Sequence, residues 1–125
     1  MPDSNQKIAK PLYQMMSIKD KENHPYQLVL VYASHNCQFT ELVEDLKELL
    51  DPNITTIITG DFNFDKEVNA LTKFLGQKNF TQIVNWPTHK QGRRLDHCYV
   101  SYNARVQVSR HSPYYSDHDA LCIGR

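Results

Sequence analysis

The sequence predicts an α/β sandwich, a fold class indicated by its hydrophobic pattern and its length. Runs rich in β-branched and aromatic residues recur along the whole chain, and between the earlier runs two segments repeat apolar residues at helical spacing. A chain of 125 residues can form one domain with a hydrophobic core and is too short for two independent domains. We therefore expect a single domain, residues 1–125.

The first part of the chain predicts a β-hairpin. Two β-rich runs, Leu12 to Ile18 and Tyr26 to Ala33, flank the polar stretch Lys19 to His24, which has the composition of a turn. The second run is nearly all apolar, and this is typical of a strand that is covered on both faces. We therefore expect layers on both sides of this strand.

Two amphipathic helices are predicted next. Thr40 is the expected N-cap of the first, which Asp51 and Pro52 end, whereas Asp65 is the expected cap of the second, which Gly76 closes. The apolar residues at helical spacing are Leu42, Val43, Leu46, Leu49 and Leu50 in the first helix and Val68, Leu71, Phe74 and Leu75 in the second.

The other predicted elements are short strands. They cover Ile54 to Thr59, ending at Gly60, then Phe80 to Val84, Leu95 to Ser101, Arg105 to Arg110 and Ala120 to Ile123, with a loop from Asn85 to Arg93. Loops at strand ends of such a fold can bring distant residues together.

Composition narrows the class of protein. Lys plus Arg and Asp plus Glu each total 14, so bulk charge gives no argument for a polyanionic partner. Three cysteines without CxxC spacing predict reduced thiols rather than a zinc site. The N-terminus lacks an apolar signal core, and no apolar run approaches the ~18 residues of a membrane span, so we expect an intracellular protein without membrane contact.

The first chemical motif is Gly60-Asp61-Phe62-Asn63, at the end of a predicted buried strand. Asp61 and Asn63 alternate with Phe62, so the two polar groups are expected to point the same way while the ring faces the core. A carboxylate can bind a metal or orient a water, and an amide beside it can bond a phosphate oxygen. A plain turn would explain the same residues, because Gly and Asp favour turns.

Two further motifs place Asp beside His, Arg94-Leu95-Asp96-His97 and Ser116-Asp117-His118-Asp119. A carboxylate that holds an imidazole fixes its tautomer and raises its pKa, so an Asp of the first motif paired with His118 would make a phosphate-facing acid or base. When either histidine is considered alone, the simpler interpretation is that His97 or His118 is an ordinary residue at a strand end, without a catalytic role. Three such motifs in one short chain favour a site.

These residues carry a resemblance. The segments LVLVYASHN, ITTIITGDFN, NWPTHKQGRRLDHCYVS and YYSDHDAL resemble the C-terminal half of the endonuclease/exonuclease/phosphatase, or DNase I-like, family of nucleases and inositol phosphatases. The sequences of three motifs, GDFNFD, PTH with a following LDH, and SDHDA, are most similar to endonuclease regions of mobile elements such as retrotransposons and Helitrons. The resemblance implies a DNase I-like β-sandwich flanked by helices.

The resemblance also implies site residues. In the family the Asp of GDFN orients or activates the attacking water and its Asn assists, which gives catalytic roles to Asp61 and Asn63. The Asp of the LDH motif supports the histidine of the SDH motif, which gives the pair Asp96 and His118. The Asp before that histidine contributes to metal binding, so Asp61 and Asp117 are the expected ligands of Mg²⁺ or Mn²⁺.

Substrate contacts are expected in two places. Tyr32 and Asn36 lie where the family has phosphate-contacting residues after a core strand, with a spacing that departs from its commonest form by about one residue. In the basic loop that follows, Trp86 would stack on a base, and His89 and Arg93 would hold phosphates. An equally simple interpretation folds Trp86 back on the core.

One departure from the family concerns its N-terminal half, which contributes an Asn and the Glu that is the principal metal ligand. Nothing before Leu28 resembles either strand, and Glu22 lies in a polar turn. We therefore expect a family domain truncated at its N-terminal side. Its partner would be the missing half or a larger mobile-element polyprotein.

The leading interpretation is an Mg²⁺-dependent endonuclease domain of mobile-element type that hydrolyses nucleic-acid phosphodiesters, DNA rather than RNA, and is nuclear if functional. One alternative is a phosphatase of the same family that acts on inositol phosphates or sphingolipid, although the basic aromatic loop favours nucleic acid. The other alternative is a non-catalytic remnant, which the absent Glu supports.

Overall fold

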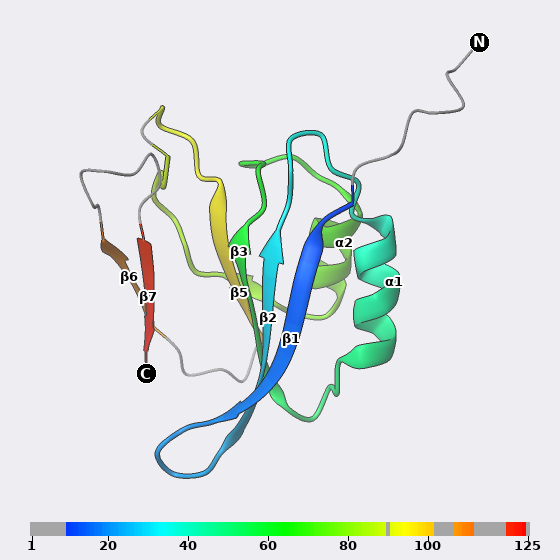
Figure 1. Ribbon diagram of the computed structural model, residues 1–125, viewed down its shortest axis with the longest axis vertical. Coiled ribbons are helices and arrows are strands. Elements are labelled where there is room, and N and C mark those ends of the chain that lie inside the picture. The colour runs from blue at the N-terminus through cyan, green and yellow to red at the C-terminus, as the bar shows by residue number, and fades with distance from the viewer. Residues whose placement is uncertain (1–9, 90, 102–106, 112–119, 125) are drawn as a thin grey trace.

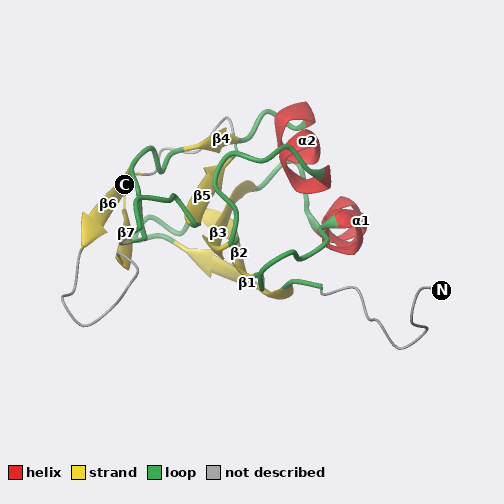
Figure 2. Ribbon diagram, turned by 90° about the horizontal axis from the view of Figure 1, so that it is seen from above, coloured by secondary structure: helices red, strands yellow, loops and turns green. Residues whose placement is uncertain are grey.

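A mixed five-stranded sheet with two helices on one side forms the centre of the protein. The computed structural model describes residues 10–89, 91–101, 107–111 and 120–124. The elements are β1 (Leu12–Lys19), β2 (Pro25–Tyr32), α1 (Thr40–Leu49), β3 (Thr55–Asp61), α2 (Ala70–Gln77), β4 (Thr81–Gln82), β5 (Asp96–Val100), β6 (Gln107–His111) and β7 (Ala120–Gly124). The main sheet has the strand order β1-β2-β3-β5-β4, and β6 and β7 form a separate pair. That pair and the helices lie on opposite sides of the main sheet (Figures 1 and 2). The predicted α/β class is confirmed.

The predicted hairpin is confirmed at β1 and β2, which pair antiparallel from Leu12 with Tyr32 to Lys19 with Pro25. Its turn is held by Asp20, whose Oδ1 accepts the main-chain N–H groups of Glu22 at 2.8 Å and His24 at 2.9 Å. A short acidic side chain that bonds the main chain a few residues further on is a common way to stabilise a turn.

The helices and the main sheet share one apolar core. α1 connects β2 to β3, which run parallel, and β5 pairs antiparallel with both β3 and β4. Alternate residues of each strand point to the helices, as the period of two in a strand requires. The most deeply buried members of this core include Val29, Leu42, Leu46, Ile58, Phe62, Leu71 and Leu75.

Within the described residues the other face of β2 is covered in part: Tyr26 is buried in the second apolar cluster and Leu28 packs against it, so the expected second layer covers one end of this strand and not the other. Leu30 is 38 % exposed and Tyr32 is 57 % exposed. On β1 the same face carries Leu12, 71 % exposed, and Ile18, 38 % exposed. The physical reason is that both helices lie on one side of the sheet. Exposed apolar side chains therefore gather along β1 and β2.

The start of α1 differs by one residue from the prediction. Thr40 is the first helical residue, and Phe39 is the N-cap without a side-chain cap bond. Phe39 is buried and its ring packs edge-on against Phe64 at a centroid distance of 5.4 Å, so apolar packing fixes this helix end. Leu49, expected in the buried stripe, is 48 % exposed.

The second helix begins later than predicted. Its N-cap is Asn69, not Asp65: the Asn69 side chain accepts the N–H of Thr72 at 3.0 Å, and the Thr72 hydroxyl accepts the N–H of Asn69 at 2.8 Å. This reciprocal pair satisfies two main-chain donors that no helical carbonyl reaches. Val68 consequently lies before the helix and is 75 % exposed, although the pattern predicts it in the buried stripe.

The same helix ends at Gln77, with Lys78 as its C-cap, rather than at Gly76, which lies inside it. The chain turns away at the next residue. Asn79 takes a left-handed conformation with φ 61°. The N–H of Phe80 donates to the carbonyl of Leu75 at 2.9 Å, and the N–H of Asn79 donates to that of Gly76 at 3.2 Å. This is the bond pattern of a Schellman ending, in which asparagine can replace the usual glycine.

Within the described ranges, no helix has the length and apolar character needed to cross a bilayer. Of the three cysteines, Cys37 and Cys98 are free thiols, in agreement with the prediction for these two. The thiol of Cys98 is buried, and burial raises its pKa to about 11.

Candidate active site

Three predicted site residues form a row along one end of the main sheet. Tyr32 is the partner of Asp61 in the parallel pair β2–β3, and Asp61 is the partner of Asp96 in the antiparallel pair β3–β5. Residues that are direct partners on neighbouring strands point to the same face of a sheet. All three therefore project from the face opposite the helices, and two carboxylates stand side by side there.

The glycine of the GDFN motif allows β2 and β3 to come together beside this row. Gly60 has φ +144°, and a Cβ at this position would lie 1.9 Å from the carbonyl oxygen of Val31. No other residue fits this backbone without moving β2. β3 continues through Gly60 to Asp61, two residues beyond the predicted end of the strand.

Asn63 ties the loop after β3 to the end of β2. Its side-chain Nδ2 donates to the carbonyl oxygen of Ala33 at 3.1 Å, and its main-chain N–H donates to Oδ1 of Asp61 at 3.0 Å. Because Asn63 has φ 55°, the strand alternation that predicts parallel side chains for Asp61 and Asn63 stops at Asp61. Phe62 faces the core as predicted, with 1 % of its surface exposed.

A hollow of about 390 Å³ opens beside Asn63. It is bounded by the loop after β2, which contains Asn36, and by the loop after β3, with Arg93 at its side. Two predicted substrate-binding residues, Asn36 and Arg93, therefore share one hollow with a predicted catalytic residue. His35 and Glu67 also line it, and the sequence motifs gave no signal for either.

Arg93 is the cation of this hollow. Its Nη2 lies 3.3 Å from Oε1 of Glu67, and both side chains are largely exposed. Hydrogen bonds from main-chain N–H groups and the positive charge of Arg93 lower the pKa of the Glu67 carboxyl. An exposed ion pair of this kind contributes little stability, so an anionic ligand can replace Glu67 as the partner of Arg93.

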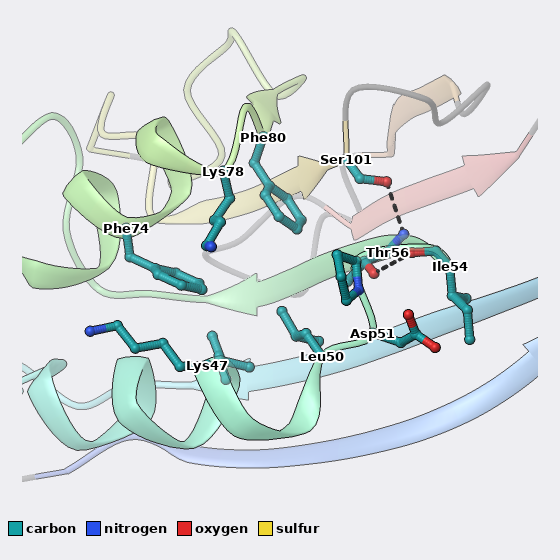
Figure 3. Close-up of a pocket in the computed structure, with 11 residues that line it drawn as sticks. Lys47, Leu50, Asp51, Ile54, Thr56, Phe74, Lys78, Phe80 and Ser101 are labelled. Carbon is teal, nitrogen blue, oxygen red and sulfur yellow. Dashed lines mark hydrogen bonds between the residues drawn. The ribbon is translucent and has the colours of Figure 1, made fainter.

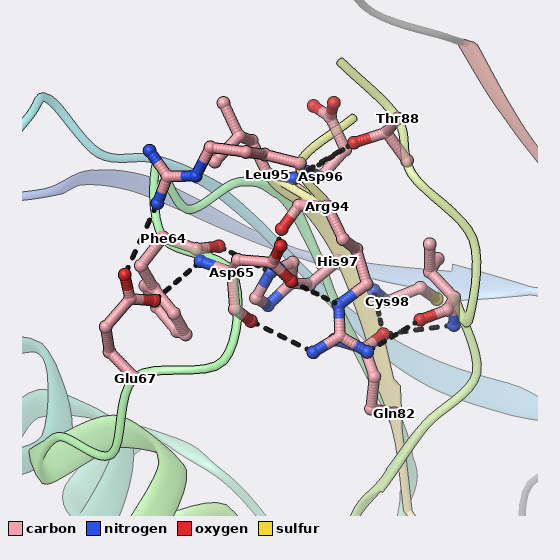
Figure 4. A network of polar contacts seen from close by, with 12 residues as sticks. Phe64, Asp65, Glu67, Gln82, Thr88, Arg94, Leu95, Asp96, His97 and Cys98 are labelled. Carbon is pink, nitrogen blue, oxygen red and sulfur yellow. Dashed lines mark hydrogen bonds and ion pairs between the residues drawn. The ribbon is translucent and has the colours of Figure 1, made fainter. Parts of the chain in front are cut away.

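Thr88 positions Asp96 from the loop before β5. Its hydroxyl is buried and accepts the main-chain N–H groups of Leu95 at 3.0 Å and Asp96 at 2.9 Å (Figure 4). This residue has no assigned role in the sequence-based prediction. A signal was available, because a threonine within a polar loop can cap main-chain donors of a strand.

Arg94 joins the loop after β3 to the segment before β5. Its Nη2 donates to the carbonyl of Asp65 at 2.9 Å and its Nη1 to the carbonyl of Val84 at 3.1 Å (Figure 4). Its Nε lies 3.6 Å from Oδ1 of Asp65. The carboxylate expected to cap a helix therefore partners a half-buried arginine.

His97 is a core residue with no exposed surface, as the simpler interpretation of this histidine has it. Its Nε2 lies 2.8 Å from the carbonyl oxygen of Phe64 and 3.0 Å from that of Arg94, so it must carry the proton. Its Nδ1 then accepts the hydroxyl hydrogen of Tyr99 at 2.7 Å. Burial lowers the pKa of His97 and raises that of Tyr99 to about 12. The neutral ring links the loop after β3 to β5.

The remaining basic-loop residues are partly engaged. Trp86 is half-buried and packs against the second apolar cluster, around Ile57 and Cys98, so the interpretation that folds it back on the core describes its position. Within the described part of the chain, its Nε1 has no hydrogen-bond partner. His89 closes the loop, since its N–H donates to the carbonyl of Arg93 at 2.9 Å and its Nδ1 accepts the N–H of Gln91 at 3.2 Å.

Two predicted site residues, Asp117 and His118, lie outside the described residues, which resume at β7 with Ala120. Among the described residues no group of three acidic, histidine or cysteine side chains could hold a metal ion. Asp61 and Asp96 offer the oxygen donors that Mg²⁺ prefers, but two carboxylates alone do not complete a site. The described residues therefore supply some, and not all, of the ligands that a metal ion needs.

The sequence pattern of the endonuclease/exonuclease/phosphatase family matches residues 21–118. No curated protein matches the sequence significantly. Among solved structures, a mannosyl-6-phosphatase from Bacteroides thetaiotaomicron VPI-5482 is similar with a TM-score of 0.66 and 18% identity, over 90% of this chain and 55% of that chain. The human Nocturnin catalytic domain is similar with a TM-score of 0.63 and 14% identity, over 90% of this chain and 52% of that chain. CdtB, the biologically active subunit of cytolethal distending toxin, is similar with a TM-score of 0.56 and 16% identity, over 90% of this chain and 56% of that chain. The chain thus spans about half the length of each, and the likeness establishes the fold.

Proposed function

Because this chain belongs to the endonuclease/exonuclease/phosphatase family and has its DNase I-like α/β fold, we propose that it serves in the hydrolysis of phosphodiesters in nucleic acid. The observation that carries the proposal is the pairing of Asp61 with Asp96 across β3 and β5, with Asn63 bonded to Asp61. Adjacent carboxylates at a strand end can orient water and collect cations, as hydrolysis of a phosphodiester requires.

Each residue has a distinct task in this proposal. Asp61 orients the attacking water, Asn63 holds the loop that carries it, and Asp96 fixes the tautomer of His118, which exchanges a proton with the phosphate oxygens. Asp61 and Asp117 are the proposed ligands of a divalent metal, Mg²⁺ or Mn²⁺. Enzymes of this family generally use divalent metals, and such an ion, when bound, stabilises the charge that develops on the phosphate.

The proposed substrate is DNA, cut by an endonuclease of mobile-element type that would act in the nucleus. Support comes from the hollow beside Asn63, where Arg93 is paired with an exposed carboxylate and Asn36 lies nearby. A guanidinium beside amide groups suits the oxygens of a phosphate. We propose the mobile-element type because the sequences of the GDFNFD, PTH–LDH and SDHDA motifs are similar to those of mobile-element endonucleases.

A partner is also proposed for the open face of the sheet. Leu12, Ile18, Leu30 and Tyr32 expose apolar surface there, and Leu12 and Tyr32 lie at the end of the sheet that carries the row of carboxylates. We propose that further strands of a family domain cover this face, provided by an N-terminal half or by a larger mobile-element polyprotein. These strands would also bring the Asn and Glu that the family uses.

Nicking of supercoiled plasmid tests the function. With Mg²⁺ and a family N-terminal half supplied in trans, we expect cleavage by the wild type and by Glu48→Gln, an exposed helix variant that serves as the matched control. Asp61→Asn and His118→Ala should each abolish it, because members of a catalytic constellation act as a unit.

The same preparations separate the alternatives. Release of phosphate from inositol phosphates, or hydrolysis of sphingomyelin, that depends on Asp61 while plasmid stays intact would replace the nuclease by a phosphatase or a sphingolipid hydrolase. Absence of any hydrolysis, even with the N-terminal half, would identify a non-catalytic remnant. Nicking that survives Asp61→Asn would contradict the proposed site.

A further inference from the structure

A second cavity lies at the other end of the main sheet. It has a volume of about 270 Å³ and opens between α1, α2 and the start of β3. β3 runs from Thr55 at this cavity to Asp61 at the carboxylate row, about 20 Å away at ~3.3 Å per residue. The cavity is therefore separate from the candidate active site.

Its walls are apolar. Leu46 and Phe74 contribute buried side chains, while Leu50, Ile54 and Phe80 are half-buried around the opening (Figure 3). A cavity of this size is smaller than the ~300 to 1,000 Å³ of a site for a drug-sized ligand and suits one short chain or a single ring. Apolar surface of this kind gains free energy when an apolar body covers it.

The polar groups at the base of the cavity already have partners. The hydroxyl of Thr56 lies 3.0 Å from Oε1 of Gln27 and 2.9 Å from the carbonyl of Ile54, and the N–H of Thr56 donates to the Ser101 hydroxyl at 3.0 Å (Figure 3). The carboxylate of Asp51 accepts the N–H of Asn53 at 2.9 Å. These groups leave the interior without a strong attraction for a polar ligand.

The charge around the cavity comes from two lysines, one on each helix segment. Lys47 of α1 and Lys78, the C-cap of α2, both line the cavity and are exposed. The ammonium group of Lys47 pairs with an exposed carboxylate, that of Glu44, at 3.3 Å. The main-chain N–H of Lys78 donates to the carbonyl of Phe74, whereas its ammonium group has no ion pair within the described residues. Lys47, Lys78 and Asp51 line the cavity, and Glu44 partly neutralises Lys47. Among the described residues, the ammonium group of Lys78 is therefore the charge at the rim that lacks an acidic partner.

We propose that this cavity binds a small organic monoanion, a molecule with a short apolar chain and one carboxylate. The chain lies against Leu46, Leu50, Phe74 and Phe80, and the carboxylate meets the ammonium groups of Lys47 and Lys78. Apolar walls select the body of the ligand, and the lysines select its charge. This ligand site is independent of the proposed hydrolysis, since it uses none of the same residues.

Calorimetric titration of the whole chain with octanoate tests the proposal, with octanol and acetate as probes of the apolar and charged parts. Octanoate should bind more tightly than either, and at ten times its Kd it should raise Tm by about 5 °C. Lys78→Gln should weaken octanoate about threefold and the double variant Lys47→Gln/Lys78→Gln about tenfold, as expected for exposed ion pairs, without weakening octanol. Lys73→Gln, on the same helix but away from the cavity, is the matched control and should bind octanoate normally.

Leu50→Phe fills part of the cavity and should abolish binding of octanoate and octanol in a folded protein. Octanoate affinity that is unchanged in Leu50→Phe would place the ligand elsewhere and overturn the proposal. Equal affinity for octanoate and octanol, or no binding of octanoate to the wild type at millimolar concentration, would also overturn it. None of these readings depends on hydrolysis of a phosphate ester.

Discussion

Asp61 of β3 is the direct antiparallel partner of Asp96 of β5. Carboxylates in this relationship repel each other, and like charges directly opposite on neighbouring strands destabilise a sheet. A cation that binds between them relieves this repulsion. We therefore expect a divalent metal to stabilise the fold through this pair.

We predict that Mg²⁺ or Mn²⁺ raises Tm of the chain, by about 5 °C at ten times the dissociation constant. Asp61→Asn and Asp96→Asn should each reduce this metal-dependent shift, because each removes one oxygen charge from the pair. Thermal unfolding followed by fluorescence at increasing metal concentration measures it. Glu48→Gln controls for loss of a surface charge, and a shift of equal size in all four proteins would contradict a metal role for the pair.

Two glycines should respond to alanine in opposite directions. In Gly60→Ala the new Cβ would meet the carbonyl of Val31 at 1.9 Å, and we expect a loss of about 3 kcal/mol or more in the free energy of unfolding. Gly76 is exposed within α2, where a Cβ would meet nothing within 4 Å, so Gly76→Ala should gain about 0.5 to 1 kcal/mol. Urea unfolding of both variants provides the comparison, and equal effects would refute the packing of β2 on β3.

Local patterns predicted most of the fold, and long-range contacts explain what they missed. Periodicity located both helices and the central strands, because burial of one face is encoded in the spacing of apolar residues. Asp65 has the composition of a helix cap, yet its neighbour is Arg94, which is distant in sequence. Asn69 and Thr72 cap the helix instead. No local pattern decides between two such candidates.

For the candidate site, the sequence predicts residues and not their arrangement. The motif sequences predict Asp61 and Asp96 as site residues. That these two residues are strand partners depends on the register of β3 and β5. The contribution of Thr88 depends on two hydrogen bonds to a strand that follows a loop. The roles of Asp117 and His118 stay predictions, since both lie outside the described residues.

Acid should weaken the fold through His97. Burial lowers the pKa of this histidine in the folded state below the ordinary value of 6.5, so the unfolded chain binds the proton more readily. Its contribution to stability is complete above about pH 6.5 and is lost as the pH falls through the lowered folded-state pKa. In His97→Gln, chemical unfolding at a series of pH values should give a smaller loss below pH 6.5. His24→Gln, in the exposed turn after β1, should lose stability in acid as the wild type does. If the free energy of unfolding falls equally with pH in both variants, His97 is not the source of the acid sensitivity.

Thr88 connects the stability of the loop before β5 with the position of Asp96, so its two conservative variants should separate a hydrogen-bonding role from a packing role. Valine has the shape of threonine without the hydroxyl, and Thr88→Val leaves the N–H groups of Leu95 and Asp96 without their acceptor. A buried unsatisfied donor costs about 1 to 3 kcal/mol, so we expect a loss of at least that size in the free energy of unfolding.

Thr88→Ser keeps the hydroxyl and loses only a methyl group, which should cost about 1 kcal/mol. In the reconstituted nicking reaction we expect kcat to fall in Thr88→Val with little change in KM, because the role proposed for the carboxylate of Asp96 is in catalysis rather than in binding. Thr88→Ser should restore kcat. A serine variant as slow as the valine variant would show that the methyl group, and not the two hydrogen bonds, holds Asp96 in place.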